Sequence, residues 1–128
     1  MAISNVATSS QALASYAAQL QAQGIAAEVI DLRTLKPLDE TTLLNSLRKT
    51  GRLVVVTEAS GLCGMAAELA ALAATRAFDA LRAPVVRLTG PDAPAASSWV
   101  LEQAALPTAE AVVQAVQGML AEAAVAVS

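Results

Sequence analysis

Residues 28–59 constrain the fold of this chain more than any other segment. An apolar run over residues 28–32 predicts a strand, Asp39 is placed to cap a helix, and Gly51 is placed to end it. The apolar run at residues 53–56, which ends in three β-branched valines, then predicts a second strand, buried on both of its faces. A strand, a helix and a strand within about thirty residues match the length of one βαβ unit. The segment therefore predicts parallel strands joined by a helix.

The rest of the chain continues this alternation. Periodicity and capping residues predict strands within residues 2–7, 25–32, 53–56 and 84–88, and helices near residues 10–23, 39–50, 65–81 and 108–123. We expect the segment from residue 89 to 98, which is rich in Gly, Pro, Ala and Ser, to form a loop. Alternating elements predict an α/β fold: one domain over residues 1–128, with three layers (α/β/α) and a mainly parallel sheet of about four strands.

Composition argues against several classes of function. The net charge is −3 and the pI about 4.8, with no long basic run, which argues against nucleic-acid binding. No uninterrupted apolar stretch is long enough to cross a bilayer, and the N-terminus lacks the basic start of a signal peptide. The single cysteine, Cys63, excludes an internal disulfide and fits a cytoplasmic protein, which is the localisation we expect.

The chain contains no histidine, which limits the chemistry it can perform. The usual general base near neutral pH and the commonest metal ligand are both missing. Neither a Ser-His-Asp triad nor a Cys-His pair can form, and one cysteine without histidine leaves no zinc site of ordinary composition. We therefore predict no catalytic, cofactor-binding or metal-binding residues in this chain.

Several short segments together are typical of one known family. They are V-I-D-L-R-T-L-K-P-L-D at residues 29–39, K-T-G-R at 49–52, E-A at 58–59, A-E-L-A at 67–70, A-P-V at 83–85 with Arg87, Asp92, and L-P at 106–107. With these segments the chain resembles, over nearly its whole length, the carboxy-terminal, transketolase-like domain of the beta subunit of thiamine-diphosphate-dependent 2-oxoacid dehydrogenases, of the pyruvate, branched-chain and acetoin types.

This resemblance implies both a strand order and a role. The strands at residues 2–7 and 53–56 would be neighbours, flanked by those at 25–32 and 84–88, and we expect the family's antiparallel edge strand to be absent. The complete enzyme would use thiamine diphosphate and magnesium bound by other domains. The role implied for this domain is assembly: it would be inactive alone, pair subunits in an oligomer and help dock a basic segment of the acyltransferase component.

The helix expected at residues 65–81 is apolar or small nearly all round. Such a helix is covered on more than one side, either by a partner subunit or by other parts of the same chain. Met65 and Leu69 are therefore candidates for contact with a partner. Trp99 is either an interface anchor or a residue of the core, and we favour the core.

Asp79 and Arg82 are the other candidates for a partner interface. Some members of the family have an acidic residue at the position of Arg82, facing the basic docking segment. The positive charge of Arg82 would repel that segment, and Asp79 is close enough in sequence to compensate.

Two loops at strand ends are candidates for binding a small anion. In the implied strand order, the loops after the first and third strands meet at a topological switch point, where open α/β sheets bind ligands. Hydroxyl and N–H groups there could hold a phosphate or carboxylate, although the same residue types serve as helix caps. The candidate residues are Thr8, Ser9, Ser10, Ser60, Gly61 and Gly64. This site supports the alternative function, a free-standing flavodoxin-like module that binds a small anion.

Two further residues near the third strand have chemical potential. Cys63 precedes a helix, where a thiolate would be favoured, but a free cysteine is more often a small buried apolar residue. Glu58 could act as an acid or base at the strand end, or could anchor the glycine loop that follows. Neither residue has a readable catalytic partner in the sequence.

Overall fold

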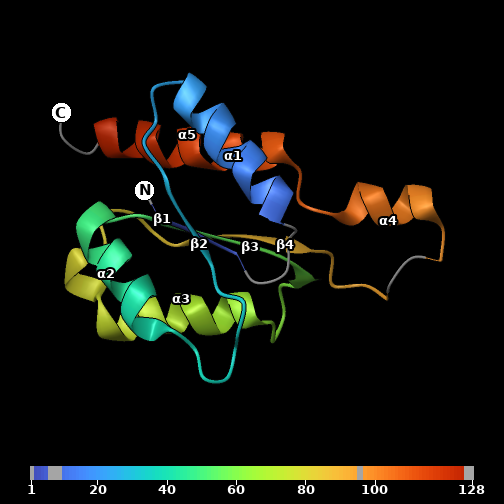
Figure 1. Cartoon of the computed structure of the whole chain (residues 1–128), viewed down its shortest axis with the longest axis horizontal. Coiled ribbons are helices and arrows are strands. Elements are labelled where there is room, and N and C mark those ends of the chain that lie inside the picture. Colours follow the sequence, from blue (N-terminus) through green and yellow to red (C-terminus); the bar gives the residue numbers. More distant parts are fainter. Residues whose placement is uncertain (1, 6–9, 95–96, 126–128) are drawn as a thin grey trace.

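The computed structural model of the chain is a parallel sheet between two layers of helices (Figure 1). It describes residues 2–5, 10–94 and 97–125. The elements in chain order are β1 (Ala2–Asn5), α1 (Ser10–Ala22), β2 (Glu28–Asp31), α2 (Glu40–Thr50), β3 (Leu53–Ser60), α3 (Met65–Arg76), the 3-10 helix η1 (Phe78–Ala80), β4 (Val86–Gly90), α4 (Trp99–Ala105) and α5 (Ala109–Val125).

The four strands have the order β2-β1-β3-β4, and every neighbouring pair is parallel. The first strand lies between the second and the third, with Ser4 in register with Ile30 on one side and Val55 on the other. This order is the one implied by the family resemblance, and the predicted α/β fold is confirmed. Within the described ranges the sheet has no antiparallel edge strand.

Strand β3 lies inside the sheet and contributes to two cores. Leu53 and Val55 pack on the side of α2 and α3, whereas Val54 and Val56 pack on the side of α1 and α5. All four side chains are fully buried, as expected for an apolar strand covered on both faces. The continuous apolar run therefore accounts for the three layers.

Helix α2 begins and ends at the residues that the sequence indicated. Asp39 caps it: Oδ1 of Asp39 accepts a hydrogen bond from the N–H of Thr42 at 3.0 Å. Hydrogen bonds from the hydroxyl and the backbone N–H of Thr42 hold the pKa of Asp39 below its usual value. Gly51 ends the helix in the left-handed conformation, with φ 72°, and its N–H donates to the carbonyl of Leu47.

Several elements differ from the sequence-based expectation. Helix α3 stops at Arg76 instead of near residue 81, because Ala77 leaves the helical conformation (φ −148°, ψ 31°) and η1 follows. Strand β4 begins at Val86 and extends to Gly90, which we had placed in a loop. Helix α4 was not predicted at all.

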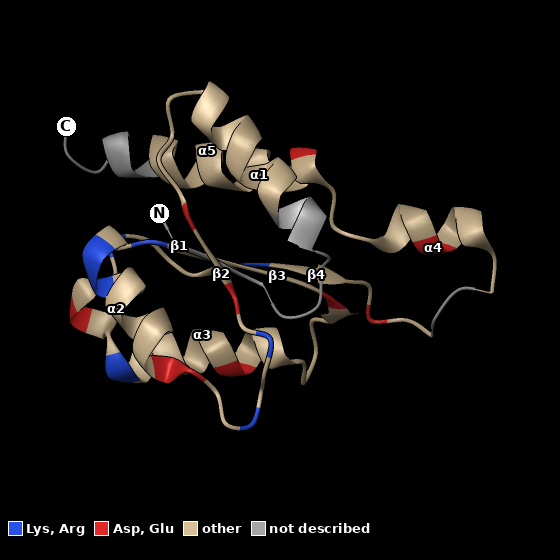
Figure 2. Cartoon of the chain, viewed as in Figure 1, with Lys and Arg blue, Asp and Glu red and all other residues tan. Residues whose placement is uncertain are grey.

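Helices α1, α4 and α5 carry no Lys or Arg, so the basic side chains lie elsewhere (Figure 2).

Candidate functional site

The loop between β3 and α3 is organised by Asp92, which follows β4. Oδ1 of Asp92 accepts hydrogen bonds from the backbone N–H of Leu62, at 3.0 Å, and from the hydroxyl of Ser60. The Ser60 hydroxyl, followed by the N–H groups of Leu62 and Gly61, holds the pKa of Asp92 below its usual value. Donors that we expected to bind an external anion are therefore engaged by a carboxylate of the same chain.

Close packing explains the glycines of this loop. A Cβ atom at Gly61 would lie 2.9 Å from Oγ1 of Thr89, and one at Gly64 would lie 2.2 Å from the carbonyl oxygen of Ser60. Arg87 secures the loop from β4, because its Nη1 donates to the carbonyl of Gly61 at 3.0 Å. The loop is thus fixed to β4 and to the segment that follows it.

The six residues of the predicted anion site are only partly described. Thr8 and Ser9 lie outside the described residues, and Ser10 is the first residue of α1. Ser60 is the last residue of β3, and Gly61 and Gly64 lie in the loop that follows it. The anion site stays a prediction, and an incoming anion would compete with Asp92 for the hydroxyl of Ser60.

A cavity of about 440 Å³ lies beside this loop, between the ends of β3 and β4 and helix α4. It is lined by Glu58, Ser60, Pro91, Ala93, Pro94, Leu101, Glu102, Ala105 and Leu106. Two carboxylates and no basic side chain line it, which disfavours a small anion by charge. Burial raises the pKa of Tyr16, and the negative charges of Glu58 and Glu110 raise it further.

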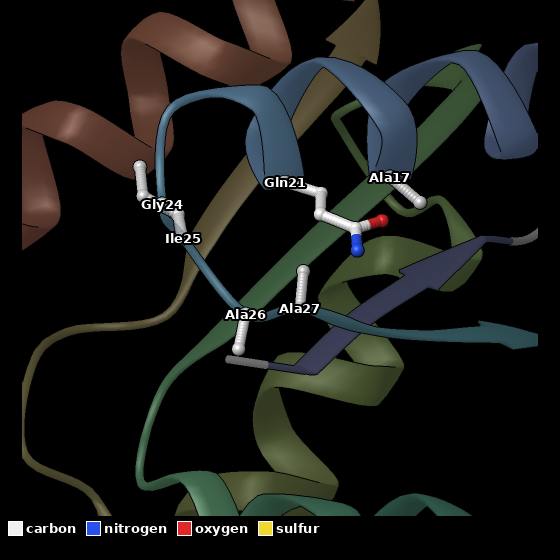
Figure 3. A pocket seen from close by; sticks show the side chains of 6 residues that line it. All are labelled: Ala17, Gln21, Gly24, Ile25, Ala26 and Ala27. Carbon is white, nitrogen blue, oxygen red and sulfur yellow. The ribbon is translucent and has the colours of Figure 1, made fainter.

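A second cavity, of about 410 Å³, lies between the last turns of α1 and the start of β2 (Figure 3). Its lining is mostly alanine and glycine backbone, and Gln21 is the one polar side chain among its lining residues. Because none of its lining residues is charged, Gln21 and backbone groups would have to orient any polar ligand there.

The structure corrects two of the interface expectations. Leu69 is fully buried in the core formed by α2, α3 and the sheet, so its side chain is not available to a partner. Trp99 is 71% exposed, so it is not a residue of the core. Met65 packs at the edge of the α2–α3 core, whereas Asp79 and Arg82 are exposed.

Helix α4 presents three neighbouring apolar side chains to solvent. Trp99, Val100 and Leu101 are 71%, 73% and 62% exposed, and the helix has no buried residue. It extends from the body of the domain, at the opposite end from α2 (Figure 1). Sequence reasoning missed this helix, although Ser98 and the following L-E-Q-A-A run, which favours helix, were available as signals. We name Trp99, Val100 and Leu101 the α4 surface.

Cys63 is exposed and adopts a positive φ of 54°, which contradicts the interpretation of a buried apolar residue. A positive φ is uncommon for a residue other than glycine, so Cys63 is a turn residue at the surface and not part of the core.

Within the described ranges, no group of three His, Cys, Asp or Glu side chains could hold a metal ion. In the same ranges, no helix is long and apolar enough to cross a membrane.

Comparison with known proteins decides the family. Residues 3–112 match the family model described as the C-terminal domain of transketolase. The chain belongs to the transketolase C-terminal domain family. This transketolase C-terminal domain is 46% identical over 106 residues to the beta subunit of acetoin:2,6-dichlorophenolindophenol oxidoreductase from Bacillus subtilis, covering 83% of the chain and 31% of that relative.

Two further relatives extend the comparison. The beta subunit of the pyruvate dehydrogenase E1 component from Rhizobium meliloti is 44% identical over 103 residues, with 80% of this chain and 22% of the relative covered. A solved structure described as a split gene transketolase, an inactive beta4 tetramer, matches 94% of this chain and 38% of its own, with a TM-score of 0.77 and 32% identity. This transketolase C-terminal domain thus spans less than a third of the curated relatives named here.

Proposed function

We propose that this chain is an assembly domain of the decarboxylating component of a 2-oxoacid dehydrogenase complex and is inactive by itself. Its identity of 44–46% to beta subunits of pyruvate dehydrogenase and of an acetoin oxidoreductase supports this role. The complete enzyme would use thiamine diphosphate and magnesium, held by other domains or subunits. The free thiol of Cys63 fits the reducing cytoplasm in which we propose that the enzyme acts.

The α4 surface is the observation that carries the proposal of subunit pairing. Three adjacent apolar side chains, each more than 60% exposed, are unfavourable in water and typical of the centre of an interface. Tryptophan in particular is enriched among the residues that dominate binding energy. The tetrameric state named for the related solved structure supports pairing between copies.

Docking of the acyltransferase component belongs to the same proposal. A basic docking segment is repelled by Arg82, which is exposed and bonds through its N–H to the carbonyl of Gly51, at the end of α2. Helix α4 lies at the opposite end of the domain from α2 (Figure 1). Glu102 lies on α4 beside Leu101, and both line the cavity that also contains Glu58. Carboxylates next to apolar groups suit a basic segment with an apolar anchor, so we place docking at this end.

Sedimentation equilibrium tests the pairing. We expect the wild-type chain to have a mass that is a multiple of 13.0 kDa, and the double variant Val100→Ser/Leu101→Ser to sediment as a monomer. Leu35→Ser/Phe78→Ser is the matched control, because it removes two exposed apolar side chains from other parts of the surface. A monomeric wild-type chain, or equal loss of mass in both variants, would contradict the proposal.

An activity measurement tests the other half of the proposal. With thiamine diphosphate, magnesium and pyruvate, the isolated chain should show neither tight cofactor binding nor release of carbon dioxide, because no residue of this domain is assigned to the cofactor. Turnover by the chain alone would show that it is not merely an assembly domain.

A further inference from the structure

Basic side chains concentrate at one end of the domain. Five of the eight Lys and Arg residues belong to the last turns of α2 and α3 or to the turns after them, where Figure 2 shows blue segments near α2. They are Arg48, Lys49, Arg52, Arg76 and Arg82. The carboxylates of the same region are Glu28, Glu40 and Asp79. This end is therefore positive, although the whole chain has a net charge of −3.

Hydrogen bonds and packing hold these segments together. The N–H of Arg82 donates to the carbonyl of Gly51 at 2.8 Å, which places Arg82 next to the segment that contains Arg52. The side chain of Arg82 lies so close to Gly51 that a Cβ atom there would be 2.8 Å from its Cγ and Cδ. Nη2 of Arg48 donates to the carbonyl of Arg76 at 3.1 Å and so joins the ends of α2 and α3.

The acids of this region neutralise only part of the charge. Lys49 pairs with Glu28, and Arg76 pairs with Glu40 at 3.4 Å. In the part of the chain that the structure describes, no carboxylate lies within 4.0 Å of Arg48, Arg52 or Arg82. Nε of Arg52 is buried and has no hydrogen-bond partner.

Stabilisation of helix ends accounts for only some of these arginines. Cations near the last turn of a helix interact favourably with its dipole, and Arg48 also satisfies a free carbonyl at the end of α3. The Nε of Arg52 is buried without a hydrogen-bond partner and lies out of reach of another molecule, whereas Arg52 as a whole is only half-buried. Phe78 belongs to η1, which lies against α2, and its ring is 75% exposed.

We propose that Arg48, Arg52 and Arg82, with Phe78, form a surface that binds an acidic segment of a partner polypeptide. Planar guanidinium groups recognise carboxylates through paired hydrogen bonds, and the exposed aromatic ring takes an apolar side chain of the same segment. This basic surface goes beyond the proposed function. It lies at the opposite end from α4, and it takes a partner of opposite charge to the basic docking segment (Figure 1).

Fluorescence anisotropy with a labelled peptide of alternating Glu and Leu tests the proposal. The wild-type chain should bind this peptide more tightly than the same peptide with Gln in place of Glu, and binding should weaken as salt is added. Arg52→Gln/Arg82→Gln should reduce affinity roughly tenfold, since two charged contacts are lost. Arg52→Lys/Arg82→Lys keeps both positive charges but loses the planar guanidinium groups, so it should retain part of the affinity. If the Gln variant bound weakly only because it was misfolded, restoring the charge with Lys would not be expected to restore binding.

Arg33→Gln/Lys36→Gln is the matched control, because it removes two positive charges from the loop between β2 and α2. We expect it to change affinity by less than about twofold, since neither residue belongs to the basic surface and Arg33 is already paired with Asp31. An equal loss in both double variants would overturn the proposal in favour of a general charge effect. Equal affinity for single-stranded DNA of the same charge would overturn it as well, since recognition would then not depend on carboxylates.

Discussion

The carboxylate of Asp92 accepts a hydrogen bond from the backbone N–H of Leu62 at 3.0 Å, across the ends of two neighbouring strands. Open α/β sheets bind ligands at this edge, often an anion held by loop N–H groups. In this domain the anion belongs to the chain itself. The loop after β3 is therefore organised by the chain's own carboxylate.

Replacing Asp92 with Asn should lower the melting temperature by a few degrees at neutral pH, because the negative charge no longer stabilises the loop. The folded-state pKa of Asp92 is lowered, so its contribution is present above the ordinary aspartate pKa, about 3.9, and is lost as the pH falls through the folded value. Thermal melts of both proteins should therefore converge at acid pH. A difference that stays constant down to that range would show that charge is not the cause.

The alternative function predicts measurable anion binding. We expect no calorimetric heat when phosphate or an organic acid is added to the wild-type chain, because Asp92 engages the hydroxyl of Ser60 and the N–H of Leu62. Asp92→Ala frees both donors and should allow weak binding. Heat in the wild-type titration that disappears in Ser60→Ala would instead favour the anion-binding module.

Leu69→Ala tests the assignment of Leu69 to the core. We expect the free energy of unfolding to fall by about 2–5 kcal/mol, the usual cost of removing a fully buried leucine side chain. Leu62→Ala is the control, because Leu62 is 72% exposed and should change stability by less than about 0.5 kcal/mol. Urea denaturation of a monomeric sample measures both. If both substitutions lowered the free energy of unfolding by similarly small amounts, Leu69 would not be a core residue.

Alanine substitutions at two glycines with the same backbone conformation can distinguish the cost of a strained backbone from the cost of a steric clash. Gly24 and Gly51 have φ of 74° and 72°, but only Gly51 has a side chain, that of Arg82, where a Cβ would go. Gly24→Ala should cost about 1–2 kcal/mol from the left-handed backbone alone. Gly51→Ala should cost slightly more and should also weaken acidic-peptide binding by displacing Arg82. Unchanged peptide affinity in Gly51→Ala would count against the position assigned to Arg82.

Local signals predicted most of the fold. The acidic cap at Asp39, the glycine stop at Gly51 and the apolar run at residues 53–56 are short-range features, and each formed the structure that its chemistry favours. The strand order came from the family resemblance, because periodicity does not specify which parallel strands are neighbours.

Features that depend on contacts between distant residues were missed. The sequence marks Asp92 only as a residue that matches the family. A single aspartate after a strand does not indicate that it will accept a hydrogen bond from an N–H group 30 residues earlier in the chain. The sequence leaves Trp99 open between the core and an interface, and our preference for the core is wrong. Its exposure is apparent only once α4 is seen to extend from the body of the domain.

The emission of Trp99 is the most direct test of the central claim, that the α4 surface pairs this domain with a partner. Trp99 is the only tryptophan and is 71% exposed in the isolated chain, so its fluorescence reports on this surface alone. As concentration is raised and the chain associates, we predict a shift of the emission maximum to shorter wavelength as the indole becomes buried. Association without any shift would contradict the account, because the chains would then be pairing elsewhere.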